Sequence, residues 1–328
     1  MIPRSRAAEQ VEGTRARRPT QAGGCAVEPR RVTFESLDGT ALGGTWYVDA
    51  SRPAPSHVVV VAPGGGIRAA SYRRLAEHLC SEGAAVLSFD YRGIGASRHG
   101  GLRGLRANML VWGRDDLGGA LDHAAARFPA AALGVVCHSI AGVMVGAARN
   151  AADVRRIVMF APHTAFFGDY RRAWRLPLFL AWHVMLPTVT RMVGYFPGRA
   201  LRLGEDLPRE FALEWAGRLH RDIGATTSDR ARWQSVLADY GRVTAEALVI
   251  SVTDDGFAPP AAARSALALY TAMRTTHEVV SPADLGQPRL GHMCFLRKDT
   301  GPYFWRKAAA WLLHTNAQVD YPSRLSSS

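Results

Sequence analysis

Hydrophobic positions after residue 30 alternate between two patterns along the chain. Runs of β-branched and other apolar residues, such as HVVVVAP at 57–63 and ALVISVT at 247–253, are typical of strands buried on both faces of a parallel sheet. Between such runs, apolar residues recur at helical spacing, as in 71–83, where Ser71 can cap the helix and Gly83 can end it. The other predicted strands are 84–90, 132–138, 154–162 and 277–283, and the other predicted helices are 107–128, 140–150, 259–273 and 302–314.

A hairpin is predicted at the start of this pattern. The strand-like segments 30–36 (RRVTFES) and 40–48 (TALGGTWYV) flank Asp38-Gly39, a frequent turn pair. Alternating strands and helices imply right-handed crossovers and a mostly parallel central sheet flanked by helices, which is the α/β class. We therefore expect one core domain from 29–162 and 246–318, with the hairpin antiparallel at one edge of the sheet.

The alternation stops between residues 163 and 245. This stretch combines many arginines and apolar helical patches with four tryptophans (Trp174, Trp182, Trp215 and Trp233), and it is too long and too apolar for a loop. We interpret it as a helical cap inserted between two strands. Ligands of open α/β sheets lie outside the carboxyl ends of the strands, so we expect the cap to cover the site. The alternative is a segment that only packs on the sheet edge.

Composition places the chain among globular proteins. Of its 328 residues, 48% are hydrophobic and 21% are charged, which excludes a disordered chain. The net charge of +12 raises the question of a nucleic-acid partner. However, Lys298 and Lys307 are the only lysines, so 40 − 2 = 38 of the basic residues are arginines, and they are spread among acids along the chain. This distribution indicates a compositional bias, and we expect no nucleic-acid partner.

The two ends of the chain, its most apolar stretch and its cysteines indicate in which cellular compartment the protein is expected. Residues 1–28 have no apolar run, so they predict a disordered basic tail and no secretory signal, and 319–328 predict a flexible tail. The most apolar stretch, 176–189, is short and contains Pro177 and Pro187, so no membrane span is expected. Four scattered cysteines without a CxxC pair fit a reducing, cytoplasmic compartment. A homo-oligomer is left open.

The strongest chemical signal is the segment 134–142 (GVVCHSIAG). A buried strand runs directly into Ser139 and then into a helix of small residues, which is typical of a tight turn that exposes a nucleophilic hydroxyl. Such a turn needs small residues two before and two after the serine, and Cys137 and Ala141 occupy these places. The alternative is an ordinary helix cap, for which serine is also favoured.

These residues resemble the α/β-hydrolase superfamily over roughly 30–315. Residues 137–142 (CHSIAG) are similar to its G-H-S-x-G-G elbow, and 90–97 (DYRGIGAS) match its D-x-R-G-x-G-x-S turn. Within the superfamily the chain is most similar to bacterial serine-aminopeptidase-like (S33-type) hydrolases, through the strings 89–98, 203–208 and 291–297. It departs from the family pattern at Cys137 and Ala141, where glycine is usual, and at Ala62-Pro63, where His-Gly is common. The resemblance implies the α/β-hydrolase fold.

The resemblance also implies three catalytic residues in the order Ser139, Asp255 and His292. Serine is a poor nucleophile at neutral pH and needs a base, here His292, which a carboxylate orients. Asp254 and Asp255 both follow a predicted strand, and the D-x-x-x-P pattern favours Asp255. The other aspartate would then cap the next helix.

The remaining site residues follow from the same chemistry. Two N–H donors must hold the oxyanion, and we expect them from Ile140 and from Gly64 or Gly65 in the glycine run after a buried strand. His163 and Trp182 in the cap are candidate substrate contacts. His138 lies beside the nucleophile and is expected to be structural. The chain has no paired HxxxH or HExxH spacing, so we expect no metal, and the chemistry requires no cofactor.

The sequence therefore predicts a serine hydrolase that cleaves an ester, thioester or amide in a small-molecule substrate with an apolar portion. Two alternatives remain open. One is an acyltransferase on the same fold, in which a dry pocket excludes water. The other is a non-catalytic ligand-binding protein, because fold does not fix function.

Overall fold

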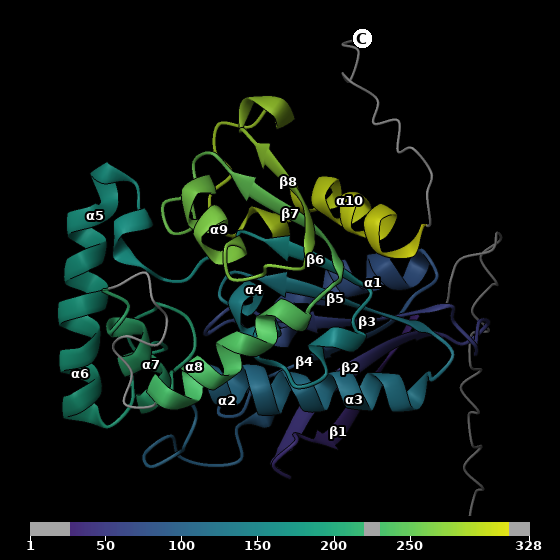
Figure 1. Ribbon diagram of the computed structural model, residues 1–328, viewed down its shortest axis with the longest axis horizontal. Helices are drawn as coiled ribbons and strands as arrows, with labels where there is room; N and C mark the ends of the chain where they lie inside the picture. The colour runs from purple at the N-terminus through teal and green to yellow at the C-terminus, as the bar shows by residue number, and fades with distance from the viewer. Residues whose placement is uncertain (1–26, 220–229, 315–328) are drawn as a thin grey trace, which may run out of the picture.

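Eight strands form one sheet at the centre of the protein, which a computed structural model describes over residues 27–219 and 230–314 (Figure 1). Their order is β1-β2-β4-β3-β5-β6-β7-β8; β1 and β2 run antiparallel, and β3 to β8 run parallel. The bounds are β1 Val27–Glu35, β2 Ala41–Asp49, β3 His57–Ala62, β4 Ala85–Phe89, β5 Ala132–His138, β6 Arg156–Phe160, β7 Glu246–Val252 and β8 Arg274–Val280. The predicted mostly parallel sheet with an edge hairpin is confirmed.

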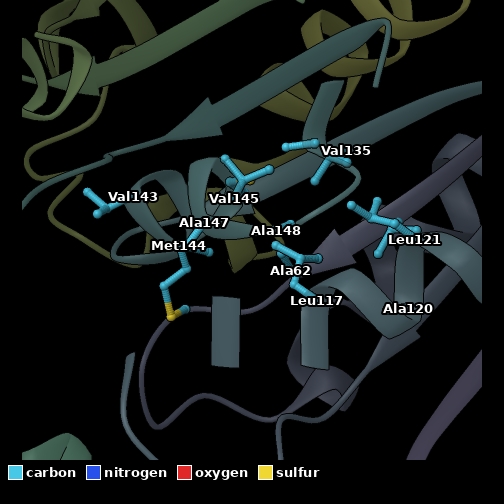
Figure 2. Close-up of a cluster of buried hydrophobic side chains, with 14 of the residues drawn as sticks. Ala62, Leu117, Ala120, Leu121, Val135, Val143, Met144, Val145, Ala147 and Ala148 are labelled. Carbon is cyan, nitrogen blue, oxygen red and sulfur yellow. The ribbon is translucent and has the colours of Figure 1, made fainter. Parts of the chain in front are cut away.

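Helices cover both faces of this sheet. One face packs against α1 (Arg73–Ser81) and α10 (Gly301–Leu313), which share an apolar core with alternate residues of the strands. The other face packs against α3 (Gly118–Arg127), α8 (Arg230–Asp239) and α9 (Pro260–Leu267). Ala62 and Val135 on this face meet side chains of α3 and of the segment after β5 (Figure 2). Strands buried on both sides explain the continuous apolar runs in the sequence.

The ends of the described core shift the predicted domain bounds slightly. Strand β1 begins at Val27, two residues inside the predicted tail of 1–28, and the rest of that tail lies outside the described residues. The predicted tail 319–328 also lies outside them. Helix α1 is preceded by the short helix η1 (Ala69–Tyr72), and the Ser71 side chain does not cap it.

The helix predicted over 140–150 is much shorter than expected. Helix α4 covers Ala141–Met144 and is followed by a single tighter turn, η4, at Val145–Ala147. Two buried tyrosines explain this end. The Tyr240 hydroxyl donates to the carbonyl of Val143 (2.8 Å), and the Tyr270 hydroxyl donates to Gly142 (2.7 Å) and accepts from the Gly146 amide (3.0 Å). These contacts satisfy backbone groups that a longer helix would have paired internally. Helix α9 is also shorter than predicted: it ends at Leu267 instead of 273, and Tyr270 lies beyond it.

In the described residues between β6 and β7, helices predominate over the region 163–245 that the sequence suggested as a helical cap. It contains α5 (Arg172–Phe179), α6 (Leu186–Val193), α7 (Arg209–Ala216) and α8. In Figure 1, α5 and α6 stand beside the sheet, with α7 next to them. Contacts link α7 to α6, and Phe211 of α7 is buried against the core of the sheet.

The prolines expected to interrupt the stretch 176–189 do not break its helix. Helices α5 and α6 join through a wider turn, η7 (Leu180–Met185), into one helix of 22 residues from Arg172 to Val193. Pro177 lies within α5, and Pro187 follows the wider turn, at the start of α6. This is the one helix in the described part of the chain that is long and apolar enough to cross a membrane, with a mean hydropathy of 1.3 and 22% of its most apolar window buried. Length and composition alone do not establish a span.

Candidate active site

Ser139 lies at a strained turn between β5 and α4. Its φ is 60°, in the left-handed region that side chains other than glycine rarely adopt. The Ser139 amide donates to the carbonyl of Phe160 at the end of β6 (2.8 Å), which ties the turn to the neighbouring strand. Cys137 and Ala141 are completely buried on either side. The small residues predicted at these two places therefore allow the turn to form.

The three residues implied by the resemblance meet at one edge of the sheet. The Oγ atom of Ser139 lies 2.9 Å from Nε2 of His292, and Nδ1 of His292 lies 2.7 Å from Oδ2 of Asp255. A carboxylate can only accept, so Nδ1 carries the hydrogen and Nε2 is left to accept the proton of the hydroxyl. The arrangement can move a proton from Oγ to His292 while the carboxylate orients the ring.

Asp254 and Asp255 have different partners. Asp255 is fully buried, and besides His292 it accepts from the amides of Phe257 (2.8 Å) and Ala258 (3.0 Å). Burial opposes ionisation, but His292 and these amides outweigh it and lower the pKa of Asp255 below its ordinary value. Asp254 instead accepts from the amides of Leu290 (2.9 Å) and Gly291 (3.0 Å). It therefore holds the loop that carries His292, and it does not cap the following helix as the sequence suggested.

Two of the three expected oxyanion donors lie side by side, and the third is engaged elsewhere. The structure assigns no acceptor among the described residues to the amides of Ile140 and Gly65, and a Cβ added at Gly65 would lie 3.5 Å from the Ile140 side chain. The amide of Gly64, however, donates to the Tyr72 hydroxyl (2.9 Å). Gly64 is therefore not free to hold an oxyanion, which leaves Ile140 and Gly65.

His138 has hydrogen-bond partners on both ring nitrogens, which agrees with the structural role expected from its position beside Ser139. Nε2 of His138 faces a carbonyl, which can only accept, so in the neutral ring Nδ1 carries no hydrogen and accepts from the Tyr72 hydroxyl (2.7 Å). The Nε2–H of His138 then points toward the carbonyl oxygen of His292, 3.3 Å away. Sequence reasoning gave no sign of Tyr72, because nothing in the chain marks a helix tyrosine as a partner of this loop.

His163, which the sequence suggested as a substrate contact, lies at hydrogen-bond distance from Ser139. Its Nε2 is 2.8 Å from Oγ of Ser139, and its Nδ1 accepts from the amide of Ala165 (3.0 Å). A signal for this placement exists in the sequence. The carboxyl ends of adjacent parallel strands meet at one edge of a sheet, and His163 follows β6 as Ser139 follows β5.

Burial keeps two of these histidines neutral. It lowers the pKa of His138 and of His163 to about 3 each. In the unfolded chain the imidazole pKa is about 6.5, so below that pH the unfolded state binds protons that the folded state refuses. We expect the free energy of unfolding to be unaffected by these groups above pH 6.5. It should fall as the pH drops from about 6.5 to about 3, by about 1.4 kcal/mol per pH unit for each ring.

Urea denaturation at a series of pH values tests this expectation, with His163→Gln as the comparison. The variant lacks one of the two rings, so its stability should decline less steeply between pH 6 and pH 4 than that of the wild type. Parallel pH dependences for the two proteins would show that His163 titrates normally in the fold.

Aromatic rings surround the reacting groups on the side of the helical segment. Trp215 lies 5.4 Å from His163 and 5.9 Å from Trp182, measured between ring centres. Trp182 also lies 5.9 Å from Phe257, which in turn lies 5.6 Å from His292. His163 therefore contacts Ser139 directly, whereas Trp182 packs on Trp215 and Phe257, the rings next to His163 and His292. Ser139 itself is only 5% exposed.

No metal site accompanies this arrangement in the described part of the chain. Within residues 27–219 and 230–314, no group of three or more His, Cys, Asp or Glu side chains is placed to hold a metal ion. A cavity of 680 Å³ lies elsewhere, over β1 and β2, and its lining does not include Ser139.

A family model matches part of the chain. Residues 53–196 match the model of the serine aminopeptidase family S33, which covers the elbow and the loop of Gly64 and Gly65. No curated protein matches the chain significantly.

Solved structures show the fold over nearly the whole chain. An esterase of Pyrococcus furiosus superposes with a TM-score of 0.55 at 15% identity, over 92% of this chain and 98% of that one. A hypothetical protein of Pseudomonas aeruginosa gives 0.58 at 17% identity, over 93% and 99%. A monoacylglycerol lipase of Paleococcus ferrophilus gives 0.50 at 16% identity, over 87% and 98%. In all three comparisons, almost the full length of the other protein is matched by this chain.

Proposed function

We propose that this chain, an enzyme of the α/β-hydrolase superfamily, cleaves an ester, thioester or amide through an acyl-enzyme on Ser139. The observation that carries the proposal is the continuous hydrogen-bonded path from Oγ of Ser139 through His292 to Asp255. Such a path lets a weak nucleophile lose its proton as it attacks.

In the proposed first half-reaction, Oγ of Ser139 attacks the carbonyl carbon while its proton passes to Nε2 of His292. The amides of Ile140 and Gly65 stabilise the negative charge that develops on the carbonyl oxygen. His292 then gives the proton to the leaving group as the bond to the carbonyl carbon breaks. In the second half, water attacks the acyl-enzyme, its proton passes through His292 to Oγ, and the acid is released.

The substrate is proposed to carry an apolar portion, because Trp215 and Phe257 lie next to the site histidines and Trp182 packs on both rings. A p-nitrophenyl ester series of increasing acyl length tests this, with kcat/KM measured for the wild type and Trp182→Ala. We expect the wild type to have a higher kcat/KM for medium-chain esters than for the acetyl ester. In the variant the ratio of these two values should fall about tenfold, because the apolar surface of the Trp182 ring is missing.

Trp311→Ala is the matched control for the chain-length series. Trp311 is a partly buried tryptophan on α10, where its indole donates to the carbonyl of Glu246. Its removal should leave the ratio between medium and short esters unchanged. A chain-length preference that Trp182→Ala does not alter would reject Trp182 as a substrate contact.

A second candidate function is acyl transfer, which the low exposure of Ser139 favours because a covered acyl-enzyme excludes water. Product analysis with and without an alcohol acceptor distinguishes the two. An ester product formed in preference to the free acid would identify a transferase. A fluorophosphonate probe tests whether either reaction is available, since a non-catalytic protein would stay unlabelled.

A further inference from the structure

The backbone after β6 holds His163 in a defined place beside Ser139. The Ser139 amide is bonded to Phe160, and the Ala161 amide donates to the carbonyl of Ile250 on β7 (2.8 Å). Ala161 and Ala165 have φ values of 48° and 62°, which residues other than glycine rarely adopt. The chain therefore turns sharply on both sides of His163, and the turn is anchored to the sheet at its start.

The protonation of the His163 ring follows from its contacts. The amide of Ala165 can only donate, so Nδ1 must accept and carries no hydrogen. In a neutral imidazole the hydrogen then lies on Nε2. The ring is almost completely buried, and it stays neutral because burial lowers its pKa to about 3.

The hydrogen bonds around Oγ of Ser139 therefore have only one consistent direction. The Nε2–H of His163 has no lone pair, so it donates to Oγ over 2.8 Å. The hydroxyl proton of Ser139 cannot go back to His163, and it donates to Nε2 of His292 over 2.9 Å. His292 in turn donates from Nδ1 to Asp255. The donor on one side of Oγ thus points the hydroxyl proton at the base on the other side.

We propose that His163 is a second catalytic histidine, a fixed N–H donor on the nucleophilic oxygen of Ser139 that never exchanges its own proton in the reaction. The inference rests on the proposed function, because it assigns His163 a part in the same acyl transfer. It goes beyond that function by giving Oγ a donor in addition to the two amides that face the carbonyl oxygen.

The chemical role follows from where charge develops. As the O–H bond of Ser139 breaks and its proton joins His292, electron density rises on Oγ until the bond to the carbonyl carbon is complete. In the second half-reaction the bond from Oγ to the acyl carbon breaks, and density returns to Oγ before the proton comes back. A preorganised N–H at hydrogen-bond distance stabilises Oγ in both passages. The N–H bond of His163 stays intact throughout, so no other reactant is needed.

A packing role for the ring is the competing explanation. His163 meets Trp215 and His292 edge to face, at 5.4 Å and 5.8 Å between ring centres. Phenylalanine at position 163 preserves an aromatic ring of similar size and removes the donor. Glutamine loses the ring, but its side-chain amide carries an N–H at about the same reach as Nε2. The two substitutions therefore separate hydrogen bonding from packing.

The test is the second-order rate constant for labelling of the full chain by a fluorophosphonate, which reports attack by Oγ and needs no knowledge of the substrate. His163→Phe is expected to label about 10 to 100 times more slowly than the wild type. His163→Gln should stay within about threefold of the wild type. His99→Gln, an exposed histidine whose ring contacts the carbonyl of Ala41, is the control and should label at the wild-type rate. Circular dichroism and thermal melts verify that each variant is folded.

The outcomes are distinguishable. A wild type that does not label would overturn the proposed function and this inference together. A labelled wild type matched in rate by folded His163→Phe would overturn the role of His163 alone. Equal slowing of folded His163→Phe and His163→Gln would also overturn it and assign the effect to packing.

Discussion

Replacing Ser139 with alanine is expected to reduce kcat/KM for a p-nitrophenyl ester at least a thousandfold. The substitution removes the hydroxyl that we propose as the nucleophile, and losses of roughly 10⁴–10⁶ in kcat are usual when a nucleophile of this kind is removed. The remaining rate would come from the amides of Ile140 and Gly65 and from substrate binding. The measurement compares initial rates of the purified variant and wild type at saturating and limiting ester.

Ser71→Ala is the matched control for this experiment. Ser71 is exposed in the turn before α1, and its side chain does not cap that helix. It should keep the wild-type rate, which excludes a general effect of purification or of losing a serine hydroxyl. Equal rates for Ser139→Ala and the wild type would reject Ser139 as the nucleophile.

Replacing Arg92 with methionine is expected to destabilise the fold by about 3–5 kcal/mol, the usual cost of leaving a buried charge without its partner. Arg92 donates to Asp116 from Nε (2.8 Å) and from a terminal nitrogen (2.6 Å), and its backbone amide donates to the same carboxylate (2.9 Å). It also bridges to Asp38 in the turn of the β1–β2 hairpin (2.7 Å). Asp116 is fully buried, so the substitution would leave its carboxylate without the guanidinium and away from solvent.

Chemical denaturation at neutral pH measures this loss, with Arg73→Met as the comparison. Arg73 makes an ion pair of similar length with Glu77 (2.7 Å), but the pair is exposed on α1. Screening by water makes such a pair nearly neutral for stability, so this variant should unfold close to the wild type. Equal decreases in the free energy of unfolding for the two variants would contradict a larger contribution of the Arg92 contacts to stability.

The fold was predictable because independent features of the sequence indicated the same architecture. Apolar runs, helical spacing and the turn at Asp38-Gly39 all agree with one sheet topology. The string 90–97 also proves to be structural. Asp90 accepts from the amides of Ala69 and Ala96, and a Cβ added at Gly95 would clash with its carboxylate. Position 95 therefore requires glycine, because the carboxylate of Asp90 leaves no room for a side chain there.

The site was only partly predictable. The order of Ser139, Asp255 and His292 is visible in the chain, because each follows a strand that ends at the same edge. Which amide of the glycine run is free is not visible, since that depends on Tyr72 reaching Gly64 from a helix. The early end of α4 has the same origin, because the hydroxyls of Tyr240 and Tyr270 come from segments about 100 residues away. Contacts between residues so far apart along the chain produce no periodic pattern in the sequence.

The left-handed turn at Ser139 has a consequence for how the chain would change over evolutionary time. Glycine adopts this conformation without the penalty of about 1 kcal/mol that a side chain incurs. In a duplicated gene whose product is no longer selected for catalysis, replacing Ser139 with glycine would remove this penalty and stabilise the protein. The serine would then be among the first residues to disappear from a descendant that only binds.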